Sequence, residues 1–396
     1  MITRRDLIIG SALSVGLSHV VSGAESLAAE NSGSELFALP GKRPLIRRTF
    51  RPPNYETPES YFREAFTPND AFFVRYHSSN IPEADPRTWR LNVHGASAQR
   101  RLSLSIEDLQ RNFPRVSVAA VNQCSGNRRS LANPRVPGVQ WGRGAMGNAL
   151  WGGVRLSDVL RAAGVGPDAL EVIFAASDKP VMPKTPAFEK SLPIDYALAE
   201  HALIAFEMNS EPLPRWHGAP ARLVVPGWTA TYWVKHLDEI RIEPQAFDNF
   251  WMKTAYRLPA GLYPGAAFRS QETAETQPIT EIVVNSMVTS HRNGDRLQRK
   301  APTEVSGWAW DGGSGIAAVE VSADAGKSWR KAKLGEDLGR FAWRGFRWQV
   351  DTAKAGPVRL WVRATSRSGA KQAETYIANA SGFHHNAIQV LSLEVA

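Results

Sequence analysis

Through the first two thirds of the chain, apolar and polar positions form short runs that switch between a strand-like and a helix-like period. Runs rich in β-branched and aromatic residues occupy positions 72–76, 116–121 and 170–174 and predict strands. Helix-like patterns begin at positions 105–109 and 155–164, and the second ends on a glycine. Because these runs follow one another without a steady strand–helix–strand rhythm, the pattern predicts an α+β fold.

After about Gln277 the pattern changes to short strands separated by clusters of turn residues. The predicted strands are residues 281–284, 304–310, 317–322 and 358–364, and the turns include residues 311–315 and 324–326. Roughly 120 residues of this kind predict a β-sandwich of immunoglobulin-like size. The paired cysteines of antibody domains are missing, so only the architecture carries over.

The N-terminus has the layout of an export signal. Arg4 and Arg5 precede an apolar stretch that runs to about Val21, and small residues follow up to Ala29. The paired arginines resemble a twin-arginine signal, which exports folded, often cofactor-loaded proteins, so we expect residues 1–29 to be a signal peptide and the protein to be periplasmic. A basic N-terminal helix or an uncleaved anchor is the alternative, although the apolar part is short for a membrane span.

We expect four segments along the chain. After residues 1–29, residues 30–56 are polar and then rich in proline and arginine, which indicates a linker or a wrapping arm. Residues 57–270 form the mixed domain, and residues 275–396 form the β-sandwich. With 43% hydrophobic and 21% charged residues, the chain has ample material for two cores.

The chain is basic, with 47 Lys and Arg against 38 Asp and Glu and a formal net charge of +9. A basic balance can serve nucleic acid, an acidic partner or an anionic small substrate. Export argues against nucleic acid, and the arginines are scattered among Gly, Pro and Trp instead of forming a basic tail. The composition therefore favours pockets for anions.

Cys124 is the only cysteine, within the run Asn122-Gln123-Cys124-Ser125-Gly126-Asn127-Arg128-Arg129. One thiol can form no intramolecular disulfide and no cysteine-rich metal cluster. It can supply one thiolate to a metal whose other ligands come from elsewhere, and the nearby arginines favour the deprotonated sulfur. A small buried hydrophobic residue is the alternative, and this run alone does not separate the two.

Several stretches together resemble the sulfite oxidase family of molybdenum enzymes, most closely its bacterial periplasmic sulfite dehydrogenases. The matching motifs are residues 72–77, 124–129, 208–214 with 217–227, and 234–235, followed by residues 307–310 and 319–329 in the tail. The similarity covers nearly all of the chain after the signal. It implies a mixed α/β molybdopterin-binding domain of the sulfite oxidase type, followed by an immunoglobulin-like dimerisation domain.

The resemblance assigns chemistry to individual residues. Cys124 matches the thiolate that holds molybdenum beside the pterin sulfurs. Arg75 matches the arginine that binds substrate oxygens, and Arg129 matches a second arginine near the same pocket. His77 matches a residue that orients Arg75 or lines the pocket. Tyr256, by its spacing from Lys235, aligns with the active-site tyrosine near the reactive centre. A surface ion pair, a structural histidine and a half-buried aromatic are the ordinary alternatives.

The pterin carries a phosphate and many ring donors and acceptors, so the resemblance also implies a set of cofactor-binding positions. These positions are Phe73, Val74, Arg75, Tyr76, His77, Cys124, Asp178, Ser191, His217, Arg222, Trp233, Val234 and Lys235. Three departures from the family pattern accompany them. Tyr76 replaces an asparagine, Thr231-Tyr232 replaces an Ala-Arg pair, and Ser381 stands where animal members have an arginine.

The implied reaction oxidises sulfite to sulfate with water and releases two electrons. The chain contains no Cys-x-x-Cys-His and no His-Pro-Gly-Gly stretch, so we expect no haem in it and an external c-type cytochrome as acceptor. We also expect a homodimer through the β-sandwich. The rival hypotheses are a molybdenum-dependent reductase of protein methionine sulfoxide, which normally lacks the long tail, a non-catalytic exported binding module and, less favoured, a nitrate reductase domain.

Overall fold

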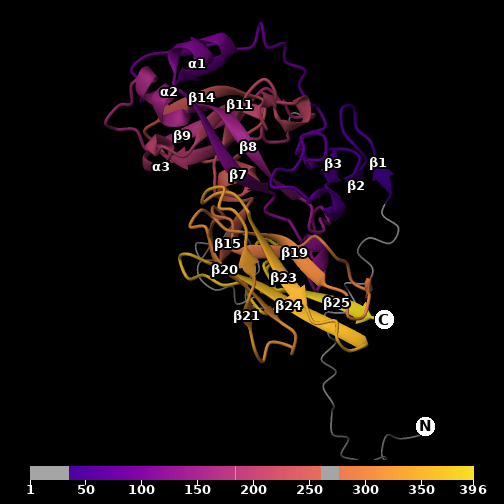
Figure 1. Cartoon of the computed structure of the whole chain (residues 1–396). Helices are drawn as coiled ribbons and strands as arrows, with labels where there is room; N and C mark the ends of the chain where they lie inside the picture. The colour runs from indigo at the N-terminus through magenta and orange to yellow at the C-terminus, as the bar shows by residue number, and fades with distance from the viewer. Residues whose placement is uncertain (1–34, 183, 260–275) are drawn as a thin grey trace, which may run out of the picture.

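The computed structural model describes residues 35–182, 184–259 and 276–396. The signal peptide expected at residues 1–29 lies outside these ranges. The described chain folds into two lobes, one made of the N-terminal two thirds and one of the C-terminal third (Figure 1). None of the described helices is long or apolar enough to cross a bilayer.

Two mostly antiparallel sheets form the first lobe, one in the order β10-β9-β14-β5-β6 and one in the order β12-β11-β8-β7, with β13 beside β11. Only β14 and β5 pair in parallel within these two sheets, which confirms the α+β class. The strands are β5 (Leu91–His94), β6 (Leu102–Leu104), β7 (Arg115–Gln123), β8 (Met146–Arg155), β9 (Glu171–Ala176), β10 (Lys190–Pro193), β11 (Leu203–Met208), β12 (Glu211–Pro212), β13 (Arg222–Val224) and β14 (Leu237–Glu243).

The helices of this lobe are short, and the two that the sequence predicts are bounded by the residues that signalled them. Ser105 caps the first helix, and the side chains and backbone amides of Ser105 and Asp108 are bonded reciprocally. Gly164 ends the second with a φ of 73°, a conformation that costs other residues energy. The helices are α1 (Ile106–Asn112), α2 (Leu156–Ala163), α3 (Ile194–Leu198) and α4 (Phe250–Lys253), with 3-10 turns η1 (Glu59–Tyr61), η2 (Arg129–Leu131), η3 (Arg215–His217) and η4 (Ala230–Tyr232).

The segment expected to be a linker or arm is folded from Glu35 onward. Its strands form a sheet in the order β1-β2-β3-β4. They are β1 (Leu36–Phe37), β2 (Leu45–Thr49), β3 (Asn54–Glu56) and β4 (Val74–Arg75). The linker interpretation is therefore wrong for this part, because its strands pair with the strand that carries Arg75. The predicted strand at residues 72–76 is also shorter, since only Val74 and Arg75 pair with β3.

The second lobe is the predicted β-sandwich. One sheet runs β17-β19-β23-β22 and the other β18-β25-β24-β20-β21, and their inner faces share an apolar core. The strands are β17 (Asn285–Val288), β18 (Arg296–Leu297), β19 (Thr303–Trp310), β20 (Ile316–Ser322), β21 (Arg330–Lys331), β22 (Lys333–Leu334), β23 (Arg344–Val350), β24 (Gly356–Ser366) and β25 (Gln389–Val395). A small sheet of β15 (Arg257–Pro259) and β16 (Thr276–Pro278) precedes it.

One predicted strand of the sandwich is misplaced. Residues 281–284 are not a strand, although Glu281 makes an isolated bridge to Trp228. The first strand of the lobe begins at Asn285 instead. Ile282 packs into a cluster between the lobes, so these apolar residues serve the junction. An apolar run this short does not reveal by itself which core it fills.

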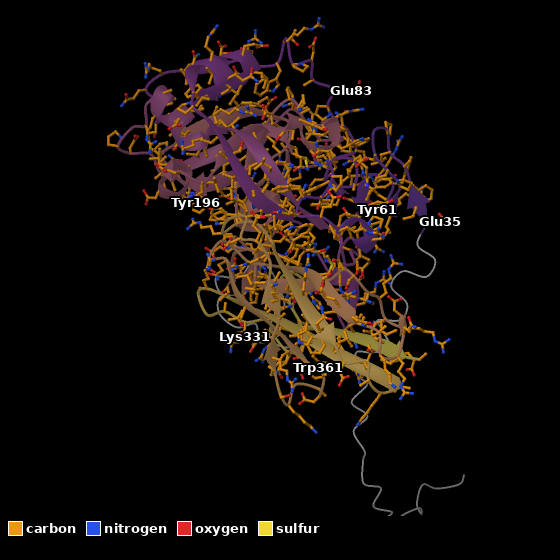
Figure 2. The ribbon with its side chains drawn as sticks, viewed as in Figure 1. Glu35, Tyr61, Glu83, Tyr196, Lys331 and Trp361 are labelled. Carbon is orange, nitrogen blue, oxygen red and sulfur yellow. The ribbon has the colours of Figure 1, made fainter. Side chains whose placement is uncertain are left out.

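The two lobes are joined by a buried apolar cluster and by hydrogen bonds close to Cys124. The cluster contains Phe62, Val121, Met146, Ile282, Met287, Trp310 and Trp343. The Trp310 indole Nε1 donates to Gln123 Oε1 over 2.7 Å, and Arg128 Nη2 donates to Ser286 O over 2.6 Å. Side chains fill this junction between the lobes (Figure 2). Strand β7, which ends just before Cys124, is therefore held by the sandwich as well as by its own sheet.

Candidate active site at Cys124

Cys124 directly follows β7. Cys124 is only 7% exposed, and its backbone N–H donates to Ala145 O over 2.9 Å. The thiol is free, and no group of three His, Cys, Asp or Glu side chains suited to a metal occurs among the described residues. Any metal held here would need ligands from a cofactor, as the single thiol predicts.

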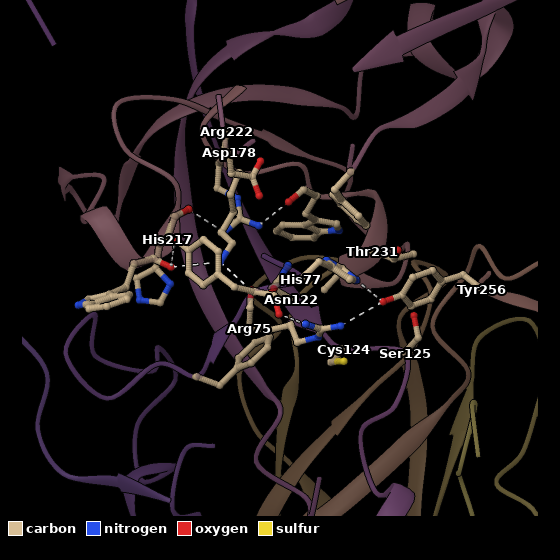
Figure 3. A pocket seen from close by; sticks show the side chains of 17 residues that line it. Arg75, His77, Asn122, Cys124, Ser125, Asp178, His217, Arg222, Thr231 and Tyr256 are labelled. Atoms are coloured by element: carbon tan, nitrogen blue, oxygen red, sulfur yellow. Dashed lines mark hydrogen bonds between the residues drawn. The ribbon is translucent and has the colours of Figure 1, made fainter. Parts of the chain in front are cut away.

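Two cavities meet at this residue. The inner cavity is lined by Phe73, Arg75, Tyr76, His77, Asn122, Cys124, Ser125, Asp178, Phe188, Trp216, His217, Arg222, Ala230, Thr231, Trp233, Lys235 and Tyr256. The outer cavity is larger and more open, and it is lined by Thr49, Pro52, Asn54, Arg75, His77, Cys124, Gly126, Arg129, Gly138, Val139, Trp141, Phe250, Trp251, Thr254, Ala255, Tyr256 and Phe383. Arg75, His77, Cys124 and Tyr256 line both. Figure 3 shows the inner cavity with Cys124 at its edge.

The inner cavity concentrates buried cations. Arg222, 3% exposed, donates from Nη1 to His217 O and from Nη2 to Trp233 O, each over 3.0 Å (Figure 3). Lys235 Nζ donates to Arg75 O over 2.7 Å. Burial lowers the pKa of Arg222 to about 9, and burial together with Arg222 lowers the pKa of Lys235 well below its usual value. Removing these charges from water costs free energy. An anionic ligand in the cavity would offset that cost.

A single carboxylate, Asp178, lines the inner cavity. Burial raises its pKa to about 6, and the charge of Lys235 opposes that rise. One carboxylate faces the cations Arg75, Arg222 and Lys235, so the cavity lining has more positive than negative charge. The lining suits a ligand that has both a phosphate and neutral hydrogen-bonding atoms.

Several buried polar atoms of the inner cavity have no hydrogen-bond partner in the described part of the chain. They are Asn122 Nδ2, Ser125 Oγ and Thr231 Oγ1. Buried polar groups are almost always paired in folded proteins, so unpaired ones that line a cavity indicate a ligand that pairs them. A pterin, whose ring carries donors and acceptors along its edge, fits this set.

Tyr76 and His236 hold the Lys235 ammonium. His236 Nδ1 lies 2.8 Å from Ala219 O, and because a carbonyl only accepts, this nitrogen carries the proton. Burial lowers the pKa of His236 to about 3, so the ring is neutral and its Nε2 accepts from the Tyr76 hydroxyl over 2.8 Å. The centre of the Tyr76 ring lies 3.0 Å from Lys235 Nζ. Tyr76, which replaces the asparagine of the family pattern, thus helps to hold the Lys235 ammonium.

His77, Tyr256 and Arg75 form a hydrogen-bonded group at the boundary of the two cavities. His77 Nε2 lies 2.5 Å from the Tyr256 hydroxyl, and Arg75 Nη2 lies 3.5 Å from the same oxygen. Burial and the charge of Arg75 lower the pKa of His77 well below its usual value, while burial raises the pKa of Tyr256. A neutral imidazole and a protonated phenol can share one proton.

Packing fixes the direction of these two side chains. The His77 ring stacks on Phe188, with the two ring centres 4.0 Å apart, and it meets the Trp251 ring edge-on. Tyr256 has a φ of 58°, unusual for a residue with a side chain, and its ring stacks on Phe383 of the sandwich lobe at 5.7 Å. Asn54 Oδ1, from β3, accepts from Arg75 Nη1 over 3.3 Å. The site is therefore assembled from both lobes and from the N-terminal arm.

Arg129 gives the outer cavity its second cation. Its Nε donates to Ser381 O over 2.7 Å and its Nη1 to Val139 O over 2.9 Å, and burial lowers its pKa. Gly126 allows the guanidinium to approach, since a Cβ there would lie 2.5 Å from Arg129 Nη1. Ser381, which stands where animal members of the family have an arginine, contributes a backbone oxygen that orients Arg129.

The structure brings most of the predicted residues to one place. Eleven of them line the inner cavity, namely Phe73, Arg75, Tyr76, His77, Cys124, Asp178, His217, Arg222, Trp233, Lys235 and Tyr256, and Arg129 lines the outer one. Val74, Ser191 and Val234 line neither cavity. They are fully or almost fully buried, so their side chains are packed away from both cavities.

Sequence reasoning missed several residues of the site. Asn122 and Ser125 flank Cys124 within the motif, and this adjacency could have signalled them. Trp141 lines the outer cavity, and its indole N–H has no partner in the described part of the chain. Asn54 and Phe383 lie far from the other site residues in sequence and join them only through the arm and the sandwich.

Comparisons with known proteins agree with this geometry. A family profile described as an oxidoreductase molybdopterin binding domain matches residues 78–251, and one described as a Mo-co oxidoreductase dimerisation domain matches residues 276–393. Sulfite oxidase of Gallus gallus is 36% identical over 82% of this chain and 72% of its own length. The chain belongs to the sulfite oxidase family.

Two further relatives and one solved structure are also similar to this chain. Mitochondrial sulfite oxidase of Homo sapiens is 37% identical over 78% of this chain, and the match spans 58% of the human protein. The chain thus matches less than two thirds of that relative's length. Sulfite oxidase of Arabidopsis thaliana is 32% identical over 78% of this chain and 80% of its own length. The solved sulfane dehydrogenase SoxCD of Paracoccus pantotrophus matches 97% of this chain and 93% of that chain, with a TM-score of 0.73 and 25% identity.

Proposed function

We propose that this protein is a molybdenum oxidoreductase that oxidises sulfite to sulfate. The observation that carries the proposal is the position of Cys124, where a cationic inner cavity and an open, arginine-lined outer cavity meet. A cofactor bound from the inner side would present its reactive centre to a small anion entering from the outer side. Family membership supports the same reaction class.

The residues of the inner cavity fit a molybdenum–pterin group. Cys124 would supply a thiolate ligand, and Arg222, Lys235 and His217 would face the anionic end. Asn122, Ser125 and Thr231 offer unpaired polar atoms for the ring. When bound, the group supplies a two-electron redox centre and the site of oxygen transfer.

The chain's own residues then bind and orient the substrate. Sulfite is an anion at neutral pH, and Arg75 and Arg129 place two guanidinium groups on the walls of the outer cavity. The overall change, sulfite and water to sulfate, two protons and two electrons, leaves protons to be removed. The Tyr256 hydroxyl and His77 Nε2, 2.5 Å apart, can hold one proton between them at the substrate side.

The decisive experiment joins elemental analysis to an assay. Protein purified from a molybdenum-replete host is expected to contain about one molybdenum and one pterin per chain and to reduce cytochrome c when sulfite is added. Cys124→Ala protein is expected to fold and to show no turnover. Wild-type protein without molybdenum and pterin would contradict the cofactor assignment, and loaded protein that is inert to sulfite would contradict the substrate.

The proposal includes an exported location, an external acceptor and a dimer. The paired arginines near the N-terminus support periplasmic export, and an external c-type cytochrome would take the electrons one at a time. The dimerisation-domain match supports a homodimer through the sandwich. Light scattering that gave the mass of one chain would contradict the dimer, and a fusion to a reporter active only after export tests the location.

The acceptor can be tested by ionic strength and by an exposed residue near the outer cavity. Phe50 is 63% exposed and lies between Thr49 and Pro52, which line that cavity. Docking of a cytochrome there predicts turnover that falls as salt rises. Phe50→Ser should raise the KM for cytochrome while leaving turnover with a small artificial dye unchanged. Salt-independent turnover with cytochrome would count against docking.

A second candidate substrate is a sulfane sulfur compound. The match to sulfane dehydrogenase covers nearly the whole chain, and the outer cavity is large for sulfite and has an aromatic wall that includes Trp141, Phe250 and Trp251. A peptide carrying a persulfidated cysteine is the appropriate probe. Loaded protein that oxidises this peptide with a higher kcat/KM than sulfite would favour the second candidate.

A further inference from the structure

Lys42, in the N-terminal arm between β1 and β2, is buried against the back of the inner cavity. Lys42 is only 8% exposed. The ammonium lies 2.5 Å from Asn69 O, 3.0 Å from Phe72 O and 2.5 Å from His217 Nε2. A buried lysine with three such neighbours has a fixed position, unlike the solvated lysine expected of a linker.

The three neighbours of Lys42 determine which ring nitrogen of His217 carries the proton. An ammonium has three donors and no acceptor, and Asn69 O and Phe72 O each take one. His217 Nε2 also lies 3.3 Å from Asn69 O, but a proton on Nε2 would face the ammonium only 2.5 Å away. The shorter contact therefore decides, and the third N–H of Lys42 donates to His217 Nε2. Burial, with the charges of Lys42 and Arg222, lowers the pKa of His217 well below its usual value, so the ring is neutral. A neutral imidazole that accepts at Nε2 carries its proton on Nδ1.

That Nδ1–H group is available to a ligand. His217 lines the inner cavity, and no hydrogen bond of its Nδ1 is recorded within the described part of the chain. Arg222 lines the same cavity and donates from Nη1 to the backbone carbonyl of His217, so the cavity presents both an imidazole and a guanidinium. An anion placed between them would receive two donors.

The charge of Lys42 depends on what fills the cavity. Burial lowers its pKa to about 7, and Asp70 partly opposes this. The amine form would leave Lys42 as an acceptor toward His217 Nε2 and reverse the tautomer. An anion in the inner cavity stabilises the ammonium, and the Nδ1–H tautomer follows from it.

The arm around Lys42 also closes the cavity. Trp216 lines the inner cavity and also a surface hollow lined by Lys42. Its indole N–H donates to Pro40 O over 2.8 Å, and Arg43 N donates to Asp70 O over 3.1 Å. The arm and Trp216 therefore form the wall between the cavity and the hollow.

We propose that Lys42 is a positioning residue for the anionic end of the pterin cofactor: it fixes His217 as an Nδ1–H donor and adds positive charge behind it. The proposal rests on the cofactor-binding role of the inner cavity given above. It makes the N-terminal arm part of the cofactor site, on the side away from the substrate.

The test compares cofactor retention in Lys42→Met, Lys42→Arg and a matched control, Arg43→Met, which removes a neighbouring exposed cation of the same arm. Each protein is purified from a molybdenum-replete host, and molybdenum and released pterin are measured before and after dilution and gel filtration. Lys42→Met should lose the cofactor about 10-fold faster than wild type. Lys42→Arg should be intermediate, and Arg43→Met should match wild type.

Melting temperatures separate a cofactor role from a purely structural one. The rise in melting temperature between cofactor-free and loaded protein should be smaller in Lys42→Met than in wild type. A structural role would lower both melting temperatures equally. Equal rises, or equal cofactor loss, would overturn the proposal, whereas wild-type protein that itself lacks pterin would overturn the proposed function instead.

Two substitutions of His217 test the tautomer. Asparagine places an amide donor near the Nδ1 position, whereas glutamine reaches the Nε2 position. His217→Asn should therefore retain the cofactor better than His217→Gln. The opposite order would mean that Nε2 is the donor and would contradict the role of Lys42.

Discussion

The inner and outer cavities share four residues but differ in how their charges are held. In the inner cavity, Arg222 and Lys235 are almost surrounded by protein, and burial lowers the pKa of both. In the outer cavity, Arg75 is only half-buried, and Arg129, although buried, lies beside an open space next to Gly126 and Phe383. The first arrangement suits a ligand that stays, and the second suits a ligand that comes and goes.

The difference follows from desolvation. A buried cation without a counter-ion is unfavourable, and that cost becomes binding energy when an anion arrives. Such a site holds its ligand tightly and makes the empty protein less stable. A half-buried cation beside open space, such as Arg75, stays partly hydrated, so an incoming anion gains less and leaves more readily. The predictions below test whether each cavity behaves this way.

The largest effect is expected at the residue between the cavities. Cys124→Ser should reduce sulfite turnover by about 1,000-fold or more, the scale on which an enzyme loses activity when a central group is removed. Steady-state kinetics and molybdenum analysis measure this. Because the thiol is small and buried, the cofactor-free variant should melt close to cofactor-free wild type. Retained activity would show that Cys124 is only part of the core.

The next largest effect should be confined to the outer cavity. Arg75→Gln should lower kcat/KM for sulfite by about 100-fold, as loss of a positioned donor to a developing anion does. Arg75→Lys keeps the charge without the planar fork and should fall between. Since Arg75 also lines the inner cavity, pterin content is measured in parallel. A fall in pterin as large as the fall in kcat/KM would contradict the division of roles.

A smaller effect is expected from a change that touches only the outer cavity. A Cβ at Gly126 would lie 2.6 Å from Arg129 Cζ, so Gly126→Ala must displace the guanidinium. The KM for sulfite should rise about 10-fold, with molybdenum content unchanged. Gly335→Ala is a suitable control, because the nearest atom to its Cβ would be 3.5 Å away. Unchanged KM in Gly126→Ala would remove Arg129 from the substrate site.

The smallest effect concerns the inner cavity of the cofactor-free protein. The pKa of Asp178 is raised from 3.8 to about 6 by burial, so between those values the folded state binds more protons than the unfolded state. The free energy of unfolding should therefore fall as pH rises from about 4 to 6, by no more than about 3 kcal/mol, and stay low above pH 6.

Asp178→Asn should remove this slope. Urea unfolding of cofactor-free protein at several pH values between 4.5 and 7 measures it, and Asp195→Asn, at an exposed aspartate, is the control. A slope that is unchanged in Asp178→Asn would mean that the carboxyl group is not penalised by burial.

Local sequence patterns predicted much of the fold. Ser105 and Gly164 mark the boundaries of two helices, and the alternating strands of the last third predict the sandwich. The misplaced strand at residues 281–284 and the wrong linker interpretation of the N-terminal arm share a cause. Both are short apolar or mixed runs whose partners are distant in sequence, and short runs do not specify which surface they pair with.

The sequence alone determined the chemistry of this protein: a single thiol, a set of arginines around it and ordered motifs that match one family. Only the tertiary structure decided that two cavities meet at Cys124, that Phe383 of the sandwich supports Tyr256, and that Lys42 of the arm reaches His217. The physical reason is that residue type fixes what a group can donate, accept or ligate. Its neighbours, and hence its charge state and direction, come from long-range packing that no local pattern encodes.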